Sequence, residues 1–462
     1  MRQEVRQVKL EVIAEEVLDH CGDANNGAGP LWCFGSPTIV RDGDRMFASV
    51  WQVGADVKPL CNTRWQLFSR EEGGQAELVQ AAQSFNEREP CPLMRLPGGR
   101  IILSVNPAVS LCGKWADGRS SYYCQPQLLE FSAADPKGPP ASHAPVWDRR
   151  YVFTEHSYRA CAADRLTGDL LVLNQTHDDE LSKQAGESIY SQCWSYRDAA
   201  GAWSRQGLLR FPLRGCYAQV ALRNRAAYVF AISDIIEPVP EWREYKKKVT
   251  GNDWDYEFRQ LFFTWTPDIT SAEFWPILTV ASRDETAGIL RNLDMWVGPD
   301  GDAHLIYTDR NVWHTFMRDR FFAGLPITVA LKYCRVRKGV VVERRTLAEC
   351  AEEQGGQKPP PGADSLGFHT RDPLVTCAAL HATPDGRLFV IYGASIRGVD
   401  SNWLLQVVPP GKATPVRVNL KTPLRSFFAA TERLGTEPSY AIDLYGLPAD
   451  PHAIRYAQLM VS

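Results

Sequence analysis

Short apolar runs separated by turn residues dominate the chain, and they follow one recurring pattern. An apolar run of strand length leads into a turn of Gly, Asn or Asp, and a second, more strongly apolar run follows. Two such runs joined by a short turn predict a β-hairpin. The pattern occurs seven times, at residues 36–51, 91–105, 155–179, 216–233, 292–309, 375–393 and 426–446, and the last copy is the most irregular.

A third strand-like run, rich in aromatic or β-branched residues, follows most copies, and a short fourth run often comes after it. Three or four antiparallel strands per unit, repeated seven times, predict an all-β, seven-bladed β-propeller. The units are longer than compact propeller repeats of roughly 40 to 50 residues. Long loops at 107–122, 237–257 and 349–368 account for the excess.

The two ends of the chain provide a way to close this ring. The last unit ends in the strand-like run 453–462, and a lone strand-like run at 9–18 precedes the first unit. We expect the N-terminal run to be the outer strand of the seventh blade, because pairing the two ends leaves no long unpaired strand edge. No independent second domain is evident, so residues 1–462 are predicted to form one propeller domain.

Few segments have a helical period. The best candidates are short, at 76–85 and 346–354. The long charged loop around Trp242 is interpreted either as a lid or saccharide-binding wall or as a solvated excursion. Its run Lys246-Lys247-Lys248 is most simply a solvated face.

Composition narrows the class of protein. The chain has 462 residues, 44% of them hydrophobic and 23% charged, which is ordinary globular usage and predicts a sizeable core. A net charge of −3 gives no reason to expect nucleic acid or a membrane surface as partner. The abundant aromatic residues suit strands and also sugar binding, although most are expected in the core.

Cysteine usage and the N-terminus bear on the compartment. The 12 cysteines are scattered without a CxxC pair, which argues against a zinc ribbon and favours free, buried thiols in a reducing compartment. No signal peptide or membrane-spanning run is apparent, so a cytoplasmic protein is expected, unless a leader was removed.

The third hairpin carries the most suggestive chemistry. His156 lies at its start and His177 near its end, with the turn 166–169 between them. Two strands of similar length joined by a tight turn bring their far ends together, so the two histidines should lie near each other. In a propeller, the loops that lead into the innermost strands gather on one face, which is the default site. Histidine can act there as general acid, general base or metal ligand, although two structural histidines are an alternative.

Further candidates lie at the same end of other blades. Tyr217 opens the fourth blade and could exchange a proton if a cation lowers its pKa, and Arg214 could supply that cation or bind a carboxylate. Core packing for Tyr217 and solvation for Arg214 are the alternatives. Arg64, Tyr190 and Arg371 are weaker candidates for substrate binding, as is Trp242.

The third and fourth blades resemble the BNR-repeat-containing seven-bladed propellers, which include ulvan lyases and related rhamnose–glucuronate lyases and hydrolases. The resemblance rests on His156, a hairpin with a Gly turn, His177 about twenty residues on, and a blade that opens with Tyr217. It implies that these three residues carry elimination chemistry and that an arginine neutralises a uronate carboxylate.

Two positions depart from the family pattern. The family's arginine follows the tyrosine on the return strand of the same blade, which here ends in Ser233-Asp234, so that role would fall to Arg214, Arg243 or Arg64. The Asn-His context of the first histidine is replaced by Glu155-His156. Sialidase-type propellers are less similar, because no S-x-D-x-G-x-x-W box is found.

Three functions therefore remain open. The first is a lyase that cleaves a uronate-containing glycoside by β-elimination, with His156 or Tyr217 as base and His177 as partner. The second is an exo-acting glycoside hydrolase, which needs a pair of carboxyl groups such as Asp178, Asp234 and Asp309 could supply. The third is a carbohydrate-binding propeller without chemistry. The expected partner is an oligosaccharide or polysaccharide and no cofactor is expected, while a structural Ca²⁺ or Zn²⁺ ion and the oligomeric state are left open.

Overall fold

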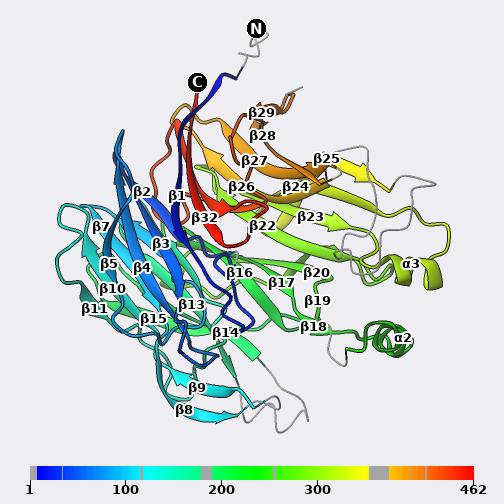
Figure 1. Cartoon of the computed structure of the whole chain (residues 1–462), viewed down its shortest axis with the longest axis horizontal. Coiled ribbons are helices and arrows are strands. Elements are labelled where there is room, and N and C mark those ends of the chain that lie inside the picture. The colour runs from blue at the N-terminus through cyan, green and yellow to red at the C-terminus, as the bar shows by residue number, and fades with distance from the viewer. Residues whose placement is uncertain are drawn as a thin grey trace.

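The computed structural model describes residues 8–33, 35–114, 118–177, 190–252, 256–352, 374–396, 398–411 and 414–462. Nearly all regular structure in these ranges is β, arranged as seven four-stranded antiparallel sheets. The chain therefore adopts the predicted seven-bladed β-propeller (Figure 1). No helix of the described residues is long and apolar enough to cross a membrane.

The blades follow one another along the chain. Blade 1 contains β2 (Ile39–Asp42), β3 (Arg45–Val53), β4 (Thr63–Glu71) and β5 (Glu77–Ala81). Blade 2 contains β6 (Leu93–Leu96), β7 (Arg100–Val105), β10 (Gln127–Ser132) and β11 (Ala141–His143). Blade 3 contains β12 (Ala160–Ala163), β13 (Leu170–His177), β14 (Tyr190–Arg197) and β15 (Trp203–Leu209). Blade 4 contains β16 (Gly215–Arg223), β17 (Ala226–Ser233), β20 (Gln260–Thr266) and β21 (Leu278–Ser282).

The remaining blades repeat this order. Blade 5 contains β22 (Ile289–Val297), β23 (Ala303–Arg310), β24 (Thr328–Arg337) and β25 (Val340–Ala351). Blade 6 contains β26 (Leu374–Ala382), β27 (Leu388–Ile396), β28 (Val399–Val408) and β29 (Val416–Val418). Blade 7 contains β30 (Ser426–Ala429), β31 (Ala441–Leu447), β32 (Ala453–Val461) and β1 (Leu10–His20). Each predicted hairpin is the inner pair of one blade.

The N-terminal strand closes the ring as predicted. β1 pairs antiparallel with β32 from Leu10 opposite Val461 to His20 opposite Ala453. The two strands, drawn in blue and red, lie side by side in Figure 1. The outermost strand of the last blade thus comes from the start of the chain. β1 covers the edge of β32, so β32 is not left as an open strand edge.

Both predicted helices are wrong. The segment at 76–85 contains strand β5, and the segment at 346–354 begins inside strand β25. Along β25, exposed and half-buried residues alternate over most of the strand, which is the period of a strand with one face toward solvent. Pairing with the neighbouring strand therefore overrides the local helical spacing.

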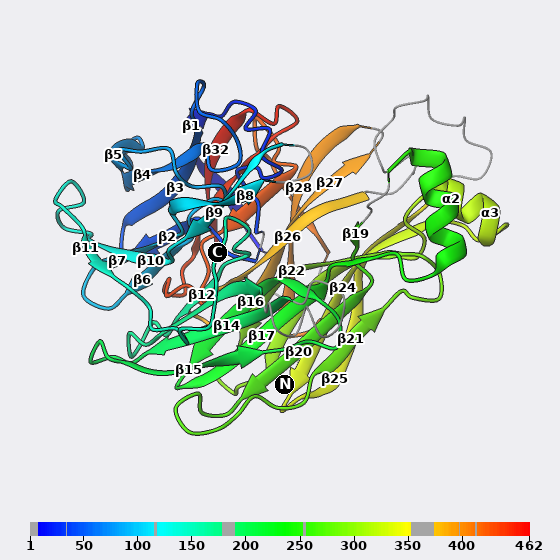
Figure 2. The same cartoon turned by 90° about the horizontal axis from the view of Figure 1, so that it is seen from below.

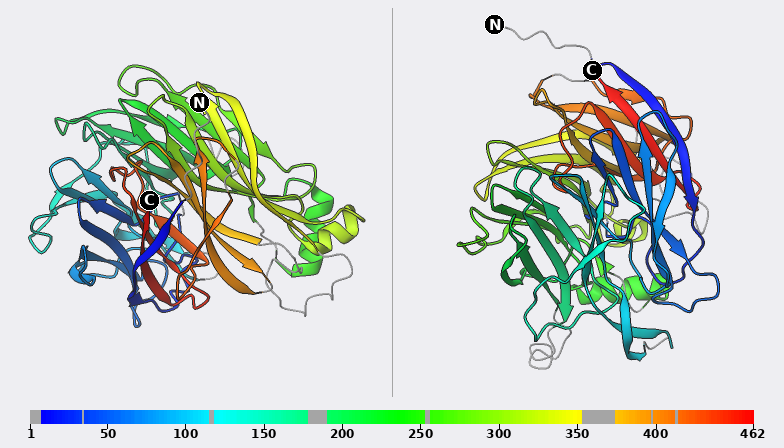
Figure 3. Two further views of the ribbon diagram at one scale, coloured as in Figure 1. Left: turned by 90° about the horizontal axis from the view of Figure 1, so that it is seen from above. Right: turned by 90° about the vertical axis from the view of Figure 1, so that its left-hand side faces the viewer.

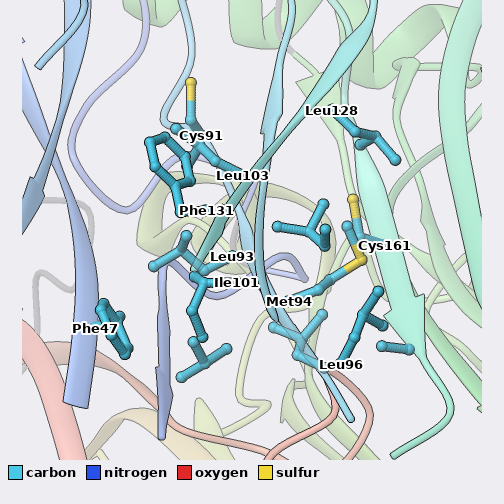
Figure 4. Close-up of a cluster of buried hydrophobic side chains, with 14 of the residues drawn as sticks. Phe47, Cys91, Leu93, Met94, Leu96, Ile101, Leu103, Leu128, Phe131 and Cys161 are labelled. Carbon is cyan, nitrogen blue, oxygen red and sulfur yellow. The ribbon is translucent and has the colours of Figure 1, made fainter. Parts of the chain in front are cut away.

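The seams between blades form the hydrophobic core. One cluster joins the inner strands of the first three blades and includes Phe47, Leu93, Phe131 and Cys161, all at most 2% exposed (Figure 4). All 12 cysteines are free, and all but Cys112 and Cys377 are buried, as the sequence predicted.

The long loop after blade 4's inner hairpin forms regular structure. It contains a two-stranded sheet of β18 (Ile235–Ile236) and β19 (Tyr256–Glu257), and helix α2 (Pro240–Thr250). α2 packs against α3 (Thr315–Phe321) of blade 5 through an aromatic cluster at the edge of the ring (Figure 2). Lys246 is only 2% exposed, so the interpretation of the lysine run as a solvated face is wrong for this residue.

The loop between β30 and β31 closes one end of the central channel. It leaves blade 7 and reaches the inner strands of five other blades. Its contacts are Arg41 N–H to Thr436 Oγ1 at 3.2 Å, Arg95 N–H to Leu434 O at 2.8 Å, Ala163 N–H to Arg433 O at 3.0 Å, Arg433 Nε to Asp294 Oδ1 at 3.1 Å and Ser439 N–H to Ala382 O at 3.3 Å. Because this loop contacts the inner strands of five other blades, it must pass across the axis of the ring. Figure 3 shows the ring from two further sides.

The other end of the channel is filled by the segment between β1 and β2. Its Trp32 ring packs edge-on against Tyr217 of blade 4 at 5.7 Å, and Ser36 Oγ donates to Arg159 O at 2.6 Å in front of blade 3. A Cβ on Gly35 would lie 2.5 Å from the carbonyl oxygen of Ala218, so only glycine fits there. Functional groups at this end must therefore lie around the segment, above the blades.

Candidate functional site

The inner hairpin of blade 3 brings its two ends together. Ala160 lies opposite Leu173, and the Gln175 N–H donates to Ser157 O at 2.7 Å, which extends the pairing beyond β12. This hydrogen bond places Ser157 opposite Gln175, one residue out of register with the β12–β13 pairs, so the backbone of His156 lies opposite Thr176 and next to that of His177. The side chain of His177 lies outside the described part of the structure. The backbones of the two histidines therefore lie near each other, as predicted.

His156 presents a partly exposed imidazole beside a buried carboxylate. Its side chain is 24% exposed, and its Nδ1 lies 3.3 Å from Oε1 of Glu155. Burial lowers the pKa of His156 below its ordinary value, and the contact with Glu155 offsets only part of this effect. The imidazole is consequently neutral near pH 7 and able to accept a proton.

Glu155 is anchored by a hairpin from the neighbouring blade. Strands β8 (Ala108–Lys114) and β9 (Ser120–Cys124) form a two-stranded sheet inserted between β7 and β10 of blade 2. Tyr122 N–H donates to Glu155 Oε2 at 2.8 Å, and Ser121 Oγ donates to the same carboxylate at 3.0 Å. This hairpin projects from the ring beside blade 3 (Figures 1 and 3).

Two further buried carboxylates, Glu89 and Glu87, hold the residues after His156. Glu89 Oε2 accepts the Ser157 hydroxyl at 2.5 Å and the Tyr158 N–H at 3.1 Å. Arg159 lies 3.4 Å from Glu87 and is 3% exposed. Glu155 and the three residues after His156 thus each have a named partner, which holds the backbone on both sides of the imidazole.

Arg214 lies at the same end of the seam between blades 3 and 4, within a group of tyrosine rings. Its guanidinium carbon lies 4.6 Å from the centroid of Tyr190, 5.5 Å from that of Tyr256 and 5.7 Å from that of Tyr158. Asp234 Oδ2 lies 3.6 Å from Nη2. We call these five residues the Arg214 cluster. Tyr190 pairs with His177 across β13 and β14, which joins the cluster to the histidine hairpin.

The Arg214 cluster combines charge with an accessible surface. The Arg214 side chain is 20% exposed, and Tyr256 is 38% exposed. Asp234 is 2% exposed, and burial raises the pKa of its carboxyl although Arg214 opposes this. Among the described residues, Arg214 Nε and Asp234 Oδ1 have no hydrogen-bond partner. A cation flanked by aromatic faces is a suitable place for an anionic sugar.

Tyr217 is placed beneath this surface. It is 5% exposed, and its ring packs against Tyr158 at 5.0 Å and Trp32 at 5.7 Å. Tyr158 and Tyr217 have φ of 42° and 49°, which is the left-handed region that non-glycine residues rarely adopt. Burial raises the pKa of Tyr217 well above its ordinary value. This geometry brings Tyr217 to the site as packing for the Arg214 cluster.

The weaker candidates lie elsewhere. Arg64 is on β4 of blade 1, where its Nε donates to Gln52 at 2.6 Å and its guanidinium covers the Phe85 ring at 4.7 Å. Trp242 packs against Phe322 at 5.5 Å between α2 and α3. Arg371 lies outside the described residues. The structure therefore brings together His156, the backbone of His177, Tyr190, Arg214 and Tyr217 from the predicted set.

Two of the three carboxylates named for a hydrolase pair with arginines. Asp309 accepts two hydrogen bonds from Arg283, at 2.5 and 2.6 Å, and Asp234 faces Arg214. Asp178 lies outside the described residues. Within the described ranges no group of three or more His, Cys, Asp and Glu side chains could hold a metal ion.

The structure adds Glu155, Tyr158 and Tyr256 to the candidate site, and the sequence analysis named none of them as a candidate. The sequence contained one signal for Glu155, which is that a carboxylate directly precedes the candidate histidine His156. Tyr256 offered none, since its approach to Arg214 depends on how the loop of blade 4 folds back.

Comparisons with known proteins agree with this fold. No protein-family model matches the chain, and no curated protein matches it. Among solved structures, a PL25 ulvan lyase bound to GlcA(1-4)Rha3S matches with 10% identity and a TM-score of 0.56, over 95% of this chain and 94% of that one. The polysaccharide lyase Uly1 matches with 10% identity and a TM-score of 0.51, over 95% and 91%. At this identity the likeness shows that the propeller fold is shared.

Proposed function

We propose that the protein is a carbohydrate-active lyase that cleaves a uronate-containing glycoside by β-elimination. The observation that carries the proposal is the presence of a neutral, partly exposed His156 and a partly exposed Arg214 at the same end of adjacent blades. Two polysaccharide lyases share the propeller fold, which supports a carbohydrate as the substrate class.

Each group has a defined task in this reaction. Arg214 binds the uronate carboxylate and reduces its charge, which makes the proton on the adjacent carbon more acidic. His156 removes that proton, and the electron pair of the C–H bond forms a carbon–carbon double bond while the bond to the leaving oxygen breaks. The leaving oxygen takes a proton from a second donor, for which His177 is the expected residue.

The tyrosines and Asp234 complete the binding surface. The ring faces of Tyr190 and Tyr256 flank the guanidinium and can stack on the apolar face of a sugar. Asp234 holds the guanidinium in place from below. Tyr217, beneath this surface, is assigned to packing and not to proton transfer.

An ultraviolet assay for the new conjugated double bond tests the proposal, with a panel of uronate-containing oligosaccharides as substrates. We expect the parent to produce this signal, with an acid limb in the pH profile of kcat/KM below 6.5, because His156 must be neutral. The variants His156→Ala and Arg214→Met should lose at least about 100-fold in kcat/KM.

Two matched variants serve as controls. His143 lies on the outer strand of blade 2, and Arg225 lies in the turn at the opposite end of blade 4. His143→Ala and Arg225→Lys should retain the activity of the parent. Sugar release without the double-bond signal would replace elimination by hydrolysis, and silence across the panel would favour a binding propeller.

A further inference from the structure

Glu155 and His156 are in side-chain contact, with the carboxylate buried and the imidazole partly exposed. The two residues are adjacent in sequence, yet their side chains turn to the same place, with Nδ1 of the imidazole 3.3 Å from Oε1 of the carboxylate. Glu155 is 2% exposed, whereas the His156 side chain keeps 24% of its surface accessible. The carboxylate therefore lies on the protein side of the imidazole.

Glu155 is itself held from the other side. The Tyr122 N–H and the Ser121 hydroxyl both donate to it. An isolated bridge between Tyr123 and Thr154 adds the segment before Glu155 to the edge of the β8–β9 hairpin. The same carboxylate also lies against Nδ1 of His156. A carboxylate fixed in this way is a strong acceptor for one imidazole N–H.

We propose that Glu155 is the positioning residue of His156: it accepts the Nδ1 proton and thereby leaves Nε2 as the nitrogen that takes a proton from substrate. This inference rests on the proposed function for its chemical meaning, but its structural content stands by itself. Arg88 and Glu89 are two further charged groups that act on His156. Arg88 pairs with Glu89 at 2.9 Å, so their opposite effects on the imidazole largely cancel.

The consequence for proton transfer follows directly. Neutral imidazole carries its proton on one nitrogen, and a hydrogen bond to a carboxylate selects Nδ1. Once Nε2 has accepted a proton, the imidazolium is stabilised by the negative charge of Glu155 next to it. Glu155 does not touch substrate, and so its effect must appear in the ionisation and tautomer of His156.

Nitrogen-15 NMR of the full-length protein with ¹⁵N-labelled histidine tests this inference without any substrate. The His156 signals are identified by their loss in His156→Gln. In the parent at pH 7.5 we expect the tautomer protonated at Nδ1. In Glu155→Gln the pKa of His156 should fall by about one unit, since a neighbouring negative charge is lost. Parent His156 protonated at Nε2 would overturn the inference, even if the variant failed to fold.

The chain contains a matched control pair. His143 Nε2 lies 3.3 Å from Glu130 Oε2, on blade 2 and away from the Arg214 cluster. Glu130→Gln removes a carboxylate from a histidine at the same distance and should leave the His156 signals and the activity unchanged. If the pKa of His156 changed equally in Glu130→Gln and in Glu155→Gln, this would contradict a specific role for Glu155.

Kinetics then separate this inference from the proposed function. If the parent shows elimination, Glu155→Gln should lower kcat by about 10- to 100-fold with KM changed less than about threefold, and should move the acid limb by the same shift as the pKa of His156. An unchanged limb would contradict the inference while leaving the lyase assignment intact. A parent without activity would refute the function, whereas the NMR tautomer would still decide the role of Glu155.

Discussion

The backbone N–H of Arg95 donates to the carbonyl oxygen of Leu434 at 2.8 Å, which ties the inner strand of blade 2 to a loop of blade 7. The loop approaches so closely that a Cβ on the next residue, Gly435, would lie 1.8 Å from the carbonyl oxygen of Arg95. Gly435 also has a φ of 87°. Glycine is therefore required there both by contact and by backbone conformation.

Substitution of Gly435 by alanine should destabilise the whole propeller. We expect the free energy of unfolding in urea to fall by roughly 2 to 5 kcal/mol, because left-handed strain adds to the displacement of the loop. Gly386 has a φ of 81° and nothing within 4 Å of its added Cβ. Gly386→Ala should thus cost only the backbone strain, roughly 1 to 2 kcal/mol. Equal losses in the two variants would show that the loop is not packed on Arg95.

The seam that closes the ring depends on a buried ion pair. Arg41 of blade 1 makes two hydrogen bonds to Asp443 of blade 7, at 2.5 and 2.7 Å. Arg41→Met or Asp443→Asn alone should cost roughly 3 to 5 kcal/mol, because each leaves a buried partner without its counter-charge. The double variant should cost less than the sum of the two, as measured by urea unfolding. Additive losses would mean that the two side chains do not interact.

The lysine run on α2 contains both a buried lysine, Lys246, and an exposed one, Lys248, whose substitutions can be compared. Lys246 is buried and forms ion pairs with Glu257 and Glu237, which Arg259 also contacts. Lys246→Met leaves two buried carboxylates with one cation, so opening of α2 should become easier by roughly 3 to 5 kcal/mol. Hydrogen exchange of the α2 amides should accelerate at least about 100-fold. Exposed Lys248, changed to Met, should leave exchange unaltered, and acceleration in both variants would contradict a special role of Lys246.

The carboxyl of Glu155 makes stability depend on pH. Burial opposes its charge, but the contacts from His156 and the Tyr122 N–H outweigh burial and lower its pKa from 4.5 to about 2. A depressed carboxyl pKa contributes stability above the unfolded value, and this is lost as pH falls from about 4.5 to about 2. The parent should therefore lose up to about 3 kcal/mol relative to Glu155→Gln over this range. A constant difference between the two proteins would show that Glu155 is not anchored in this way.

The sequence by itself determined the seven hairpins, the closing role of the N-terminal strand and the placement of His156 and His177 near each other at one end of a hairpin. These features depend on apolar runs, turn residues and hairpin register, which are local properties. The two predicted helices failed because pairing with neighbouring strands decided β5 and β25.

Only the tertiary structure decided which groups meet. Arg214 gathers tyrosines from blades 3 and 4, Lys246 is buried by carboxylates beyond its own helix, and Glu155 is held by a hairpin of blade 2. The β30–β31 loop likewise makes its contacts to the other blades only when the ring is closed. The physical reason is that side-chain contacts between segments far apart in the sequence depend on how the blades pack. No local sequence pattern specifies which of these segments meet.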